Sequence, residues 1–126
     1  MRQIIQTDSA PAAIGPYSQA VRAGDLVFVS GQIPLEPGGD ALVGETPAEQ
    51  ARQCMENVSA VAEAAGTSLE NAVRLTIFTT DLAAFAEINE VYGGFFGDEP
   101  PARAAVGVAA LPKGALVEID AVLLAG

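Results

Sequence analysis

The sequence contains no histidine and no tryptophan, and Cys54 is its only cysteine. An intrachain disulfide and a cysteine metal cluster are therefore excluded, as are the serine–histidine and cysteine–histidine pairs of common hydrolases. Zinc sites usually draw on histidine or several cysteines, so the sequence predicts no metal site. Any catalysis must use arginine, carboxylates, hydroxyl groups or the backbone.

Positive charge is also scarce, with six basic residues against sixteen acidic ones and a formal net charge of −10. The bases are scattered along the chain at Arg2, Arg22, Arg52, Arg74, Arg103 and Lys113. Nucleic-acid binding draws its affinity from clustered cations that neutralise phosphates, so the sequence predicts no nucleic-acid partner. An anionic small molecule would need a local positive site on so acidic a protein.

Long apolar runs are missing too: none approaches the roughly 18 to 20 residues of a membrane span. The N-terminus has no signal-peptide pattern, so we predict a cytoplasmic protein with no membrane partner. Half of the 126 residues are nevertheless hydrophobic, and the mean hydropathy is +0.32. The length favours one domain covering residues 1–126, and the apolar excess favours an oligomer.

Hydrophobic periodicity predicts six strands and two helices. The predicted strands cover residues 2–6, 19–22, 26–30, 72–80, 103–109 and 116–124. A capping box at residues 46–49 begins the first helix, which runs to Gly66, and Asp81 begins the second, which ends by Gly97. The expected buried stripe of the second helix consists of Leu82, Phe85, Ile88, Tyr92 and Phe95. This order predicts an α+β fold in which two helices cover one face of a mixed β-sheet. Cys54 lies on the apolar stripe of the first helix and is expected in the core.

The other face of the predicted sheet has no helix to cover it. We expect it to carry Phe28, Phe78, Leu116 and Val122. An exposed apolar patch of this kind usually marks an interface, which again favours an oligomer.

Arg103 is the first candidate functional residue. Pro100 and Pro101 favour an extended, stiff chain just before it, so its guanidinium is aimed from a defined strand end. Arginine can form two parallel hydrogen bonds to a carboxylate, which lysine cannot. The alternative is an ordinary surface arginine. Glu118 and Asp120 project from an otherwise apolar strand face, with Arg103 as a candidate partner or a solvated strand edge as the alternative.

Six short segments stand out as motifs: residues 10–20 (APAAIGPYSQA), 30–34 (SGQIP), 95–96 (FF), 101–103 (PAR), 111–115 (LPKGA) and 117–119 (VEI). Together these segments resemble the motifs of the RidA family. The members are reactive-intermediate deaminases, also called endoribonuclease L-PSP or translation-inhibitor proteins. The similarity runs in order from about residue 2 to residue 124.

The resemblance implies a chorismate-mutase-like fold, a homotrimer, and three sites in clefts between neighbouring subunits. It also implies cofactor-independent hydrolysis of enamines and imines such as 2-aminoacrylate, 2-iminobutanoate and 2-iminopropanoate to 2-keto acids and ammonia. The substrate would be a small carboxylate.

By the same resemblance, Arg103 would grip the substrate carboxylate and Glu118 would help to place the attacking water. The remaining residues that match the family pocket are Tyr17, Ser30, Gly31 and Asn89. Ala105 stands where many family deaminases have a cysteine, which changes the pocket volume and leaves substrate preference open.

Two other functions remain open from the sequence. One is a non-catalytic protein of the same fold that binds keto or imino acids. The other is the ribonuclease or translation inhibitor of the family's older names, although phosphodiester cleavage without histidine or a metal cluster would be hard to explain.

Overall fold

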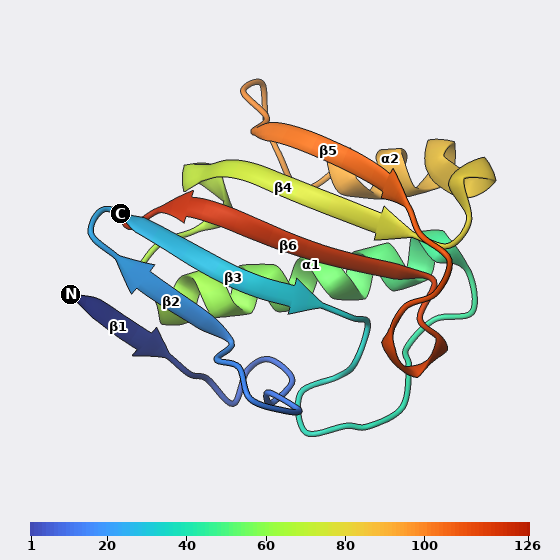
Figure 1. Cartoon of the computed structure of the whole chain (residues 1–126). Helices are drawn as coiled ribbons and strands as arrows, with labels where there is room; N and C mark the ends of the chain where they lie inside the picture. Colours follow the sequence, from blue (N-terminus) through green and yellow to red (C-terminus); the bar gives the residue numbers. More distant parts are fainter.

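A computed structural model describes all 126 residues of the chain. Six strands form one sheet in the order β1-β2-β3-β6-β4-β5 (Figure 1). The strands are β1 (Arg2–Ile5), β2 (Ala20–Ala23), β3 (Leu26–Gln32), β4 (Ala72–Thr79), β5 (Ala102–Gly107) and β6 (Val117–Leu124). All neighbours are antiparallel except β4 and β5, which are parallel. The predicted strands are confirmed, and the predicted mixed sheet with them.

Two α-helices, α1 (Pro47–Ala64) and α2 (Phe85–Gly93), lie on the same side of the sheet (Figure 1). The predicted capping box begins α1: the Thr46 side chain accepts from the Glu49 backbone N–H, and the Glu49 carboxylate accepts in return. These backbone hydrogen bonds lower the pKa of Glu49. Short 3-10 turns are η1 (Leu69–Asn71), η2 (Leu82–Ala84) and η3 (Pro112–Gly114). None of the helices is long and apolar enough to cross a membrane.

The core lies between the helices and one face of the sheet. Cys54 is buried in it, as predicted, and burial raises the pKa of its thiol well above the usual value. Four alternate residues of β6 face this core and are buried: Val117, Ile119, Ala121 and Leu123. Paired residues on adjacent strands point to the same side of a sheet. The register of β6 with β3 and β4, and of β4 with β5, therefore assigns the residues of these strands to one face or the other.

The opposite face, which we call the open face, has no helix over it (Figure 1). Phe28 pairs with Val122, and Phe78 with both Glu118 and Val106, so these side chains share that face. Phe28 is 46% exposed, which confirms the predicted uncovered apolar surface. Leu116 was expected here as well, but it packs against the core cluster because it precedes β6 and does not follow the strand's alternation.

The second predicted helix is shorter than its apolar pattern indicates. Asp81 caps the 3-10 turn η2 by accepting from the Ala83 N–H, and α2 itself runs only from Phe85 to Gly93. Leu82 was expected on the buried stripe but is 55% exposed. The chain therefore changes direction between the capping residue and the helix, which moves Leu82 off the stripe.

Candidate functional site

Four of the predicted site residues line one cavity of about 460 Å³. Tyr17, Ser30, Gly31 and Glu118 surround it, together with Ile14, Ile33, Pro112 and Lys113. The residues come from the loop before β2, the end of β3, the turn η3 and the start of β6. The cavity thus brings together segments that are far apart in the sequence.

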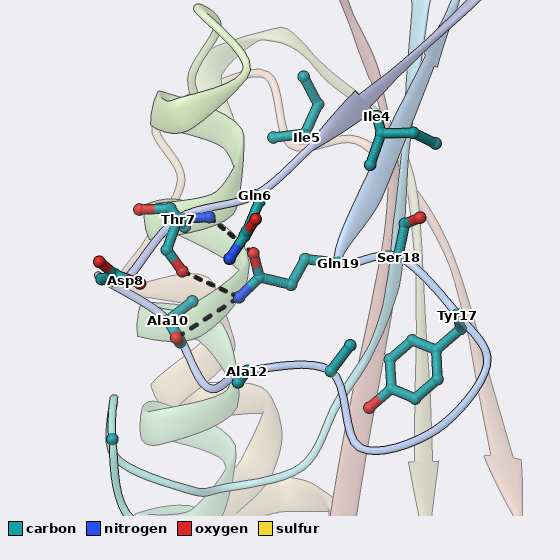
Figure 2. Close-up of a pocket in the computed structure, with 12 residues that line it drawn as sticks. Ile4, Ile5, Gln6, Thr7, Asp8, Ala10, Ala12, Tyr17, Ser18 and Gln19 are labelled. Carbon is teal, nitrogen blue, oxygen red and sulfur yellow. Dashed lines mark hydrogen bonds between the residues drawn. The ribbon is translucent and has the colours of Figure 1, made fainter.

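The loop that carries Tyr17 is fixed by Gln19. The side chain of Gln19 is buried, accepts from the Thr7 N–H at 2.7 Å, and donates to the carbonyls of Thr7 and Pro11 at 3.1 and 2.7 Å. Figure 2 shows this amide inside the curve of the loop, with Tyr17 on the far side. The Tyr17 hydroxyl accepts from the Ile14 N–H at 3.1 Å. The sequence gave no signal that Gln19, a polar residue at the start of a predicted strand, would hold this loop in place.

A local irregularity in β3 brings Gly31 against Glu118. The pairing of β3 with β6 shifts register between Val29 and Gln32, and Ser30 there donates to the Ser18 carbonyl at 2.6 Å. A Cβ added at Gly31 would overlap the Glu118 carboxylate. Only glycine leaves room for that carboxylate in its present position, which gives the glycine of the motif a steric role.

Glu118 is half-buried on the open face. Burial, and then the charge of Asp120 two residues further along the same face, raise the pKa of Glu118 above its usual 4.5. A carboxylate with a raised pKa is a stronger base than an exposed one, so Glu118 is suited to accept a proton near neutral pH.

Arg103 lies on the other side of the sheet. It pairs with Leu75, which is buried under the helices, whereas Glu118 pairs with Phe78 on the open face. The predicted pairing of Arg103 with Glu118 or Asp120 is therefore wrong within one chain. The alternation of side chains along strands separates them, and β5 is an edge strand.

The contacts of Arg103 come from α2 instead. Its Nη1 donates a short hydrogen bond to Oδ1 of Asn89, and its Cζ lies 5.1 Å from the ring centroid of Phe85 and 5.0 Å from that of Tyr92. Asn89 is exposed, so it meets Arg103 without being buried as a core polar group. Ala105 is exposed and, because it pairs with Ile77, shares the face of Arg103.

The predicted residues thus form two groups. Tyr17, Ser30, Gly31 and Glu118 line the cavity, which we call the Glu118 half-site. Arg103, Asn89 and Ala105 lie beside α2 at the β5 edge, which we call the Arg103 half-site. Nowhere does the structure gather three or more cysteine, aspartate or glutamate side chains in a group that could hold a metal ion.

Comparisons with known proteins identify the family. The model of the endoribonuclease L-PSP family matches residues 7–125. Human 2-iminobutanoate/2-iminopropanoate deaminase is 44% identical to this chain over 126 residues, which is 100% of this chain and 92% of the human protein. This chain belongs to the endoribonuclease L-PSP (RidA) family.

Solved structures of the RidA family confirm the predicted fold class. RidA from the Antarctic bacterium Psychrobacter sp. PAMC 21119 is 49% identical, with a TM-score of 0.93 over 97% of this chain and 98% of that chain. E. coli TdcF with bound serine is 46% identical, with a TM-score of 0.92 over 97% and 98%. At this similarity the arrangement of strands and helices is shared along nearly the whole chain.

A second cavity of about 490 Å³ lies between β1 and the loop that precedes β2 (Figure 2). Tyr17 lines it, but Ser30, Gly31 and Glu118 do not, and Asp8 is its only charged residue. The smaller cavity therefore remains the candidate site, because it contains a base with a raised pKa.

Sequence reasoning missed three features of the site. Gln19 was treated only as the first residue of a strand, although it fixes the loop. Lys113 was quoted within a motif, but its place on the cavity wall depends on the left-handed turn at φ 59°. The rings beside Arg103 were assigned only to the core stripe, since spacing cannot show which strand crosses a helix.

Proposed function

We propose that this protein is an imine and enamine deaminase that hydrolyses 2-aminoacrylate-type intermediates, such as 2-iminopropanoate and 2-iminobutanoate, to 2-keto acids and ammonia. The observation that carries the proposal is the combination of a free guanidinium fork with a carboxylate of raised pKa in a family whose relatives include named deaminases of this type. The reaction needs no metal and no organic cofactor.

The chemistry requires little beyond positioning. A protonated 2-imino acid is already electrophilic at C2, so the protein has to hold the carboxylate and deliver a water molecule. Water adds to C2 while Glu118 accepts one of its protons. Glu118 returns that proton to the nitrogen of the resulting carbinolamine. Ammonia then leaves while the hydroxyl group gives up its proton to solvent, which forms the carbonyl of the 2-keto acid.

Arg103 is the proposed carboxylate receptor. Only Nη1 is engaged by Asn89, so the remaining N–H groups are free to donate two parallel hydrogen bonds to a carboxylate. Tyr17, Ser30 and Gly31 would bound the pocket around the water. Ala105, in place of the cysteine of many relatives, leaves the pocket wider and without a thiol next to the substrate.

We further propose that the active form is a homotrimer in which each site joins the Arg103 half-site of one subunit to the Glu118 half-site of its neighbour. Arg103 and Glu118 lie on opposite faces of one sheet, so one chain cannot present both to one small substrate. The apolar open face, with Phe28 nearly half exposed, supports burial against other copies of the chain.

In the decisive test, an amino-acid oxidase generates imino acids in the reaction mixture. Semicarbazide traps these imino acids, and the protein competes with the trap by hydrolysing them. Wild type should divert the imine to keto acid. Arg103→Ala should abolish this activity, and Arg103→Lys should lower kcat/KM by about 10- to 100-fold, because losing charge-assisted hydrogen bonds costs about 1.5–3 kcal/mol.

Folding and oligomeric mass of both variants serve as controls, since Arg103 is exposed and should not be needed for either. If wild type accelerates none of the imino acids, the ligand-binding function of the same fold replaces the deaminase. If the Arg103→Ala protein is as active as wild type, Arg103 is not the carboxylate receptor.

A further inference from the structure

Resting on the proposed role of Arg103 as carboxylate receptor, we propose that Phe85 and Tyr92 are positioning residues that hold its guanidinium between their rings. Its Cζ lies 5.1 Å from the Phe85 centroid and 5.0 Å from the Tyr92 centroid. Both distances lie within the roughly 6 Å over which a guanidinium is attracted to an aromatic face.

The three supports of Arg103 occupy one stripe of α2. Phe85, Asn89 and Tyr92 stand at positions i, i+4 and i+7, which lie above one another on a helix. The Cα atoms of Phe85 and Tyr92 are two helical turns apart, about 10.5 Å along the axis, and the two rings converge on the guanidinium, with centroids 5.1 and 5.0 Å from Cζ. The guanidinium therefore lies over the turn between them, with Asn89 beneath Nη1.

Strand β5 itself cannot hold this side chain. The neighbours of Arg103 on the strand are Ala102, Ala104 and Ala105, whose methyl groups are too short to restrain a long arginine, and β5 is the sheet edge. Without α2, the substrate would have to order a flexible side chain when it binds, which weakens binding. The helix stripe supplies that order in advance.

Support by aromatic rings also leaves the N–H donors of Arg103 available for its ligand. A neighbouring carboxylate would hold the arginine equally well, and the chain has sixteen acidic residues, but it would occupy the fork that has to receive the substrate. Rings stack on the guanidinium plane and leave its N–H edge open. Only Asn89 uses a donor, at one nitrogen.

The Tyr92 hydroxyl takes no part in this arrangement. It is buried and has no hydrogen-bond partner, so the ring face and not the hydroxyl is what this position supplies to Arg103. Phe96 packs on the same ring, with centroids 5.0 Å apart, but the two rings that the guanidinium lies over are those of Phe85 and Tyr92. These two facts provide matched controls.

The experiment compares Phe85→Leu and Tyr92→Leu with Tyr92→Phe and Phe96→Leu. In ¹⁵N-labelled protein, the Nε–Hε resonance of Arg103, assigned from its absence in Arg103→Lys, reports ring-current shifts directly. Both Leu variants at positions 85 and 92 should move this resonance toward the value of a free arginine. Tyr92→Phe, which keeps the ring, should leave it in place, and so should Phe96→Leu.

Kinetics on an imino acid provide the second measurement. Because Arg103 would bind the carboxylate in the ground state and the transition state alike, Phe85→Leu and Tyr92→Leu should raise KM about tenfold while kcat changes less than about threefold. Tyr92→Phe and Phe96→Leu should keep KM within about twofold of wild type. If Tyr92→Leu does not fold, Phe85→Leu, at a less buried position, decides the question.

An unchanged Arg103 resonance in Phe85→Leu, or an unchanged KM, overturns the positioning role. A rise in KM of equal size in Phe96→Leu also overturns it, because general loosening of the cluster would then explain the effect. Failure of wild type to hydrolyse any imino acid is a separate result: it removes the proposed function, and the resonance still shows whether the rings hold Arg103.

Discussion

The two half-sites carry opposite charges, and the protein positions these two charged side chains in different ways. Arg103 stands on an exposed strand edge among alanines and is supported by side chains of α2. Glu118 is half-buried on a central strand, and its carboxylate lies in the space that a side chain at position 31 would occupy. The cation keeps its donors free because rings and one amide hold it. The base gains strength because burial and Asp120 raise its pKa. The proposed function would use both properties, open donors to bind an anion and a stronger base to remove a proton.

The half-sites also face opposite sides of one sheet, so the comparison predicts that they work only in trans. Arg103→Ala and Glu118→Gln should each be inactive alone. Unfolded, mixed in equal amounts and refolded together, they should recover about a quarter of wild-type activity, because each mixed ring of three contains one intact site. The measurement is imine hydrolysis against the two variants refolded separately.

Light scattering on the same samples should give about three times the 12.8 kDa chain mass. A monomer with full activity, or a mixture no more active than its parts, contradicts the shared site. In that case Arg103 and Glu118 do not act on one substrate.

A substitution at Gly31 tests the Glu118 half-site without changing the Arg103 half-site. Gly31→Ala should displace the carboxylate and lower kcat by about 10- to 100-fold, since a shift near 1 Å at a reacting group can cost 10²-fold. Carboxylate binding, which depends on the other half-site, should change much less, so KM should stay within about threefold.

Gly93→Ala is the matched control, because an added methyl there meets nothing within 4 Å. A normal kcat in Gly31→Ala would show that Glu118 can move without loss. Its position would then not be set by the close approach of β3.

The smallest expected effect is on pH dependence. Glu118 must be ionised to accept a proton, so kcat/KM should fall as the pH drops through its raised pKa, above 4.5. Asp120→Asn removes the negative charge that helps to raise this pKa, so the acid limb should move to lower pH.

Asp25→Asn removes the same charge from the exposed β2–β3 turn and should leave the acid limb where it is. An acid limb that stays in place or moves to higher pH in Asp120→Asn would contradict the assignment of the base to Glu118.

Much of the fold was predictable because its signals are local. The capping box at Thr46 begins α1, and the alternation from Val117 to Leu123 gives β6 its buried face. The errors lie at the ends of helices and strands. Leu82 follows the capping residue but lies on a 3-10 turn, and Leu116 precedes β6, although its face was predicted from the alternation of that strand.

The sequence also limited the residue types of the candidate site: without histidine or a second cysteine, a base had to come from the carboxylates or hydroxyl groups, and a charged anion receptor from the six basic residues. Only the tertiary structure decided how they are arranged. The parallel register of β5 on β4 turns Arg103 toward α2 and away from Glu118, and the register shift in β3 brings Gly31 against that carboxylate. Which strands become neighbours, and in what register, depends on contacts between distant segments, and a short-range pattern of apolar and polar residues carries no record of them.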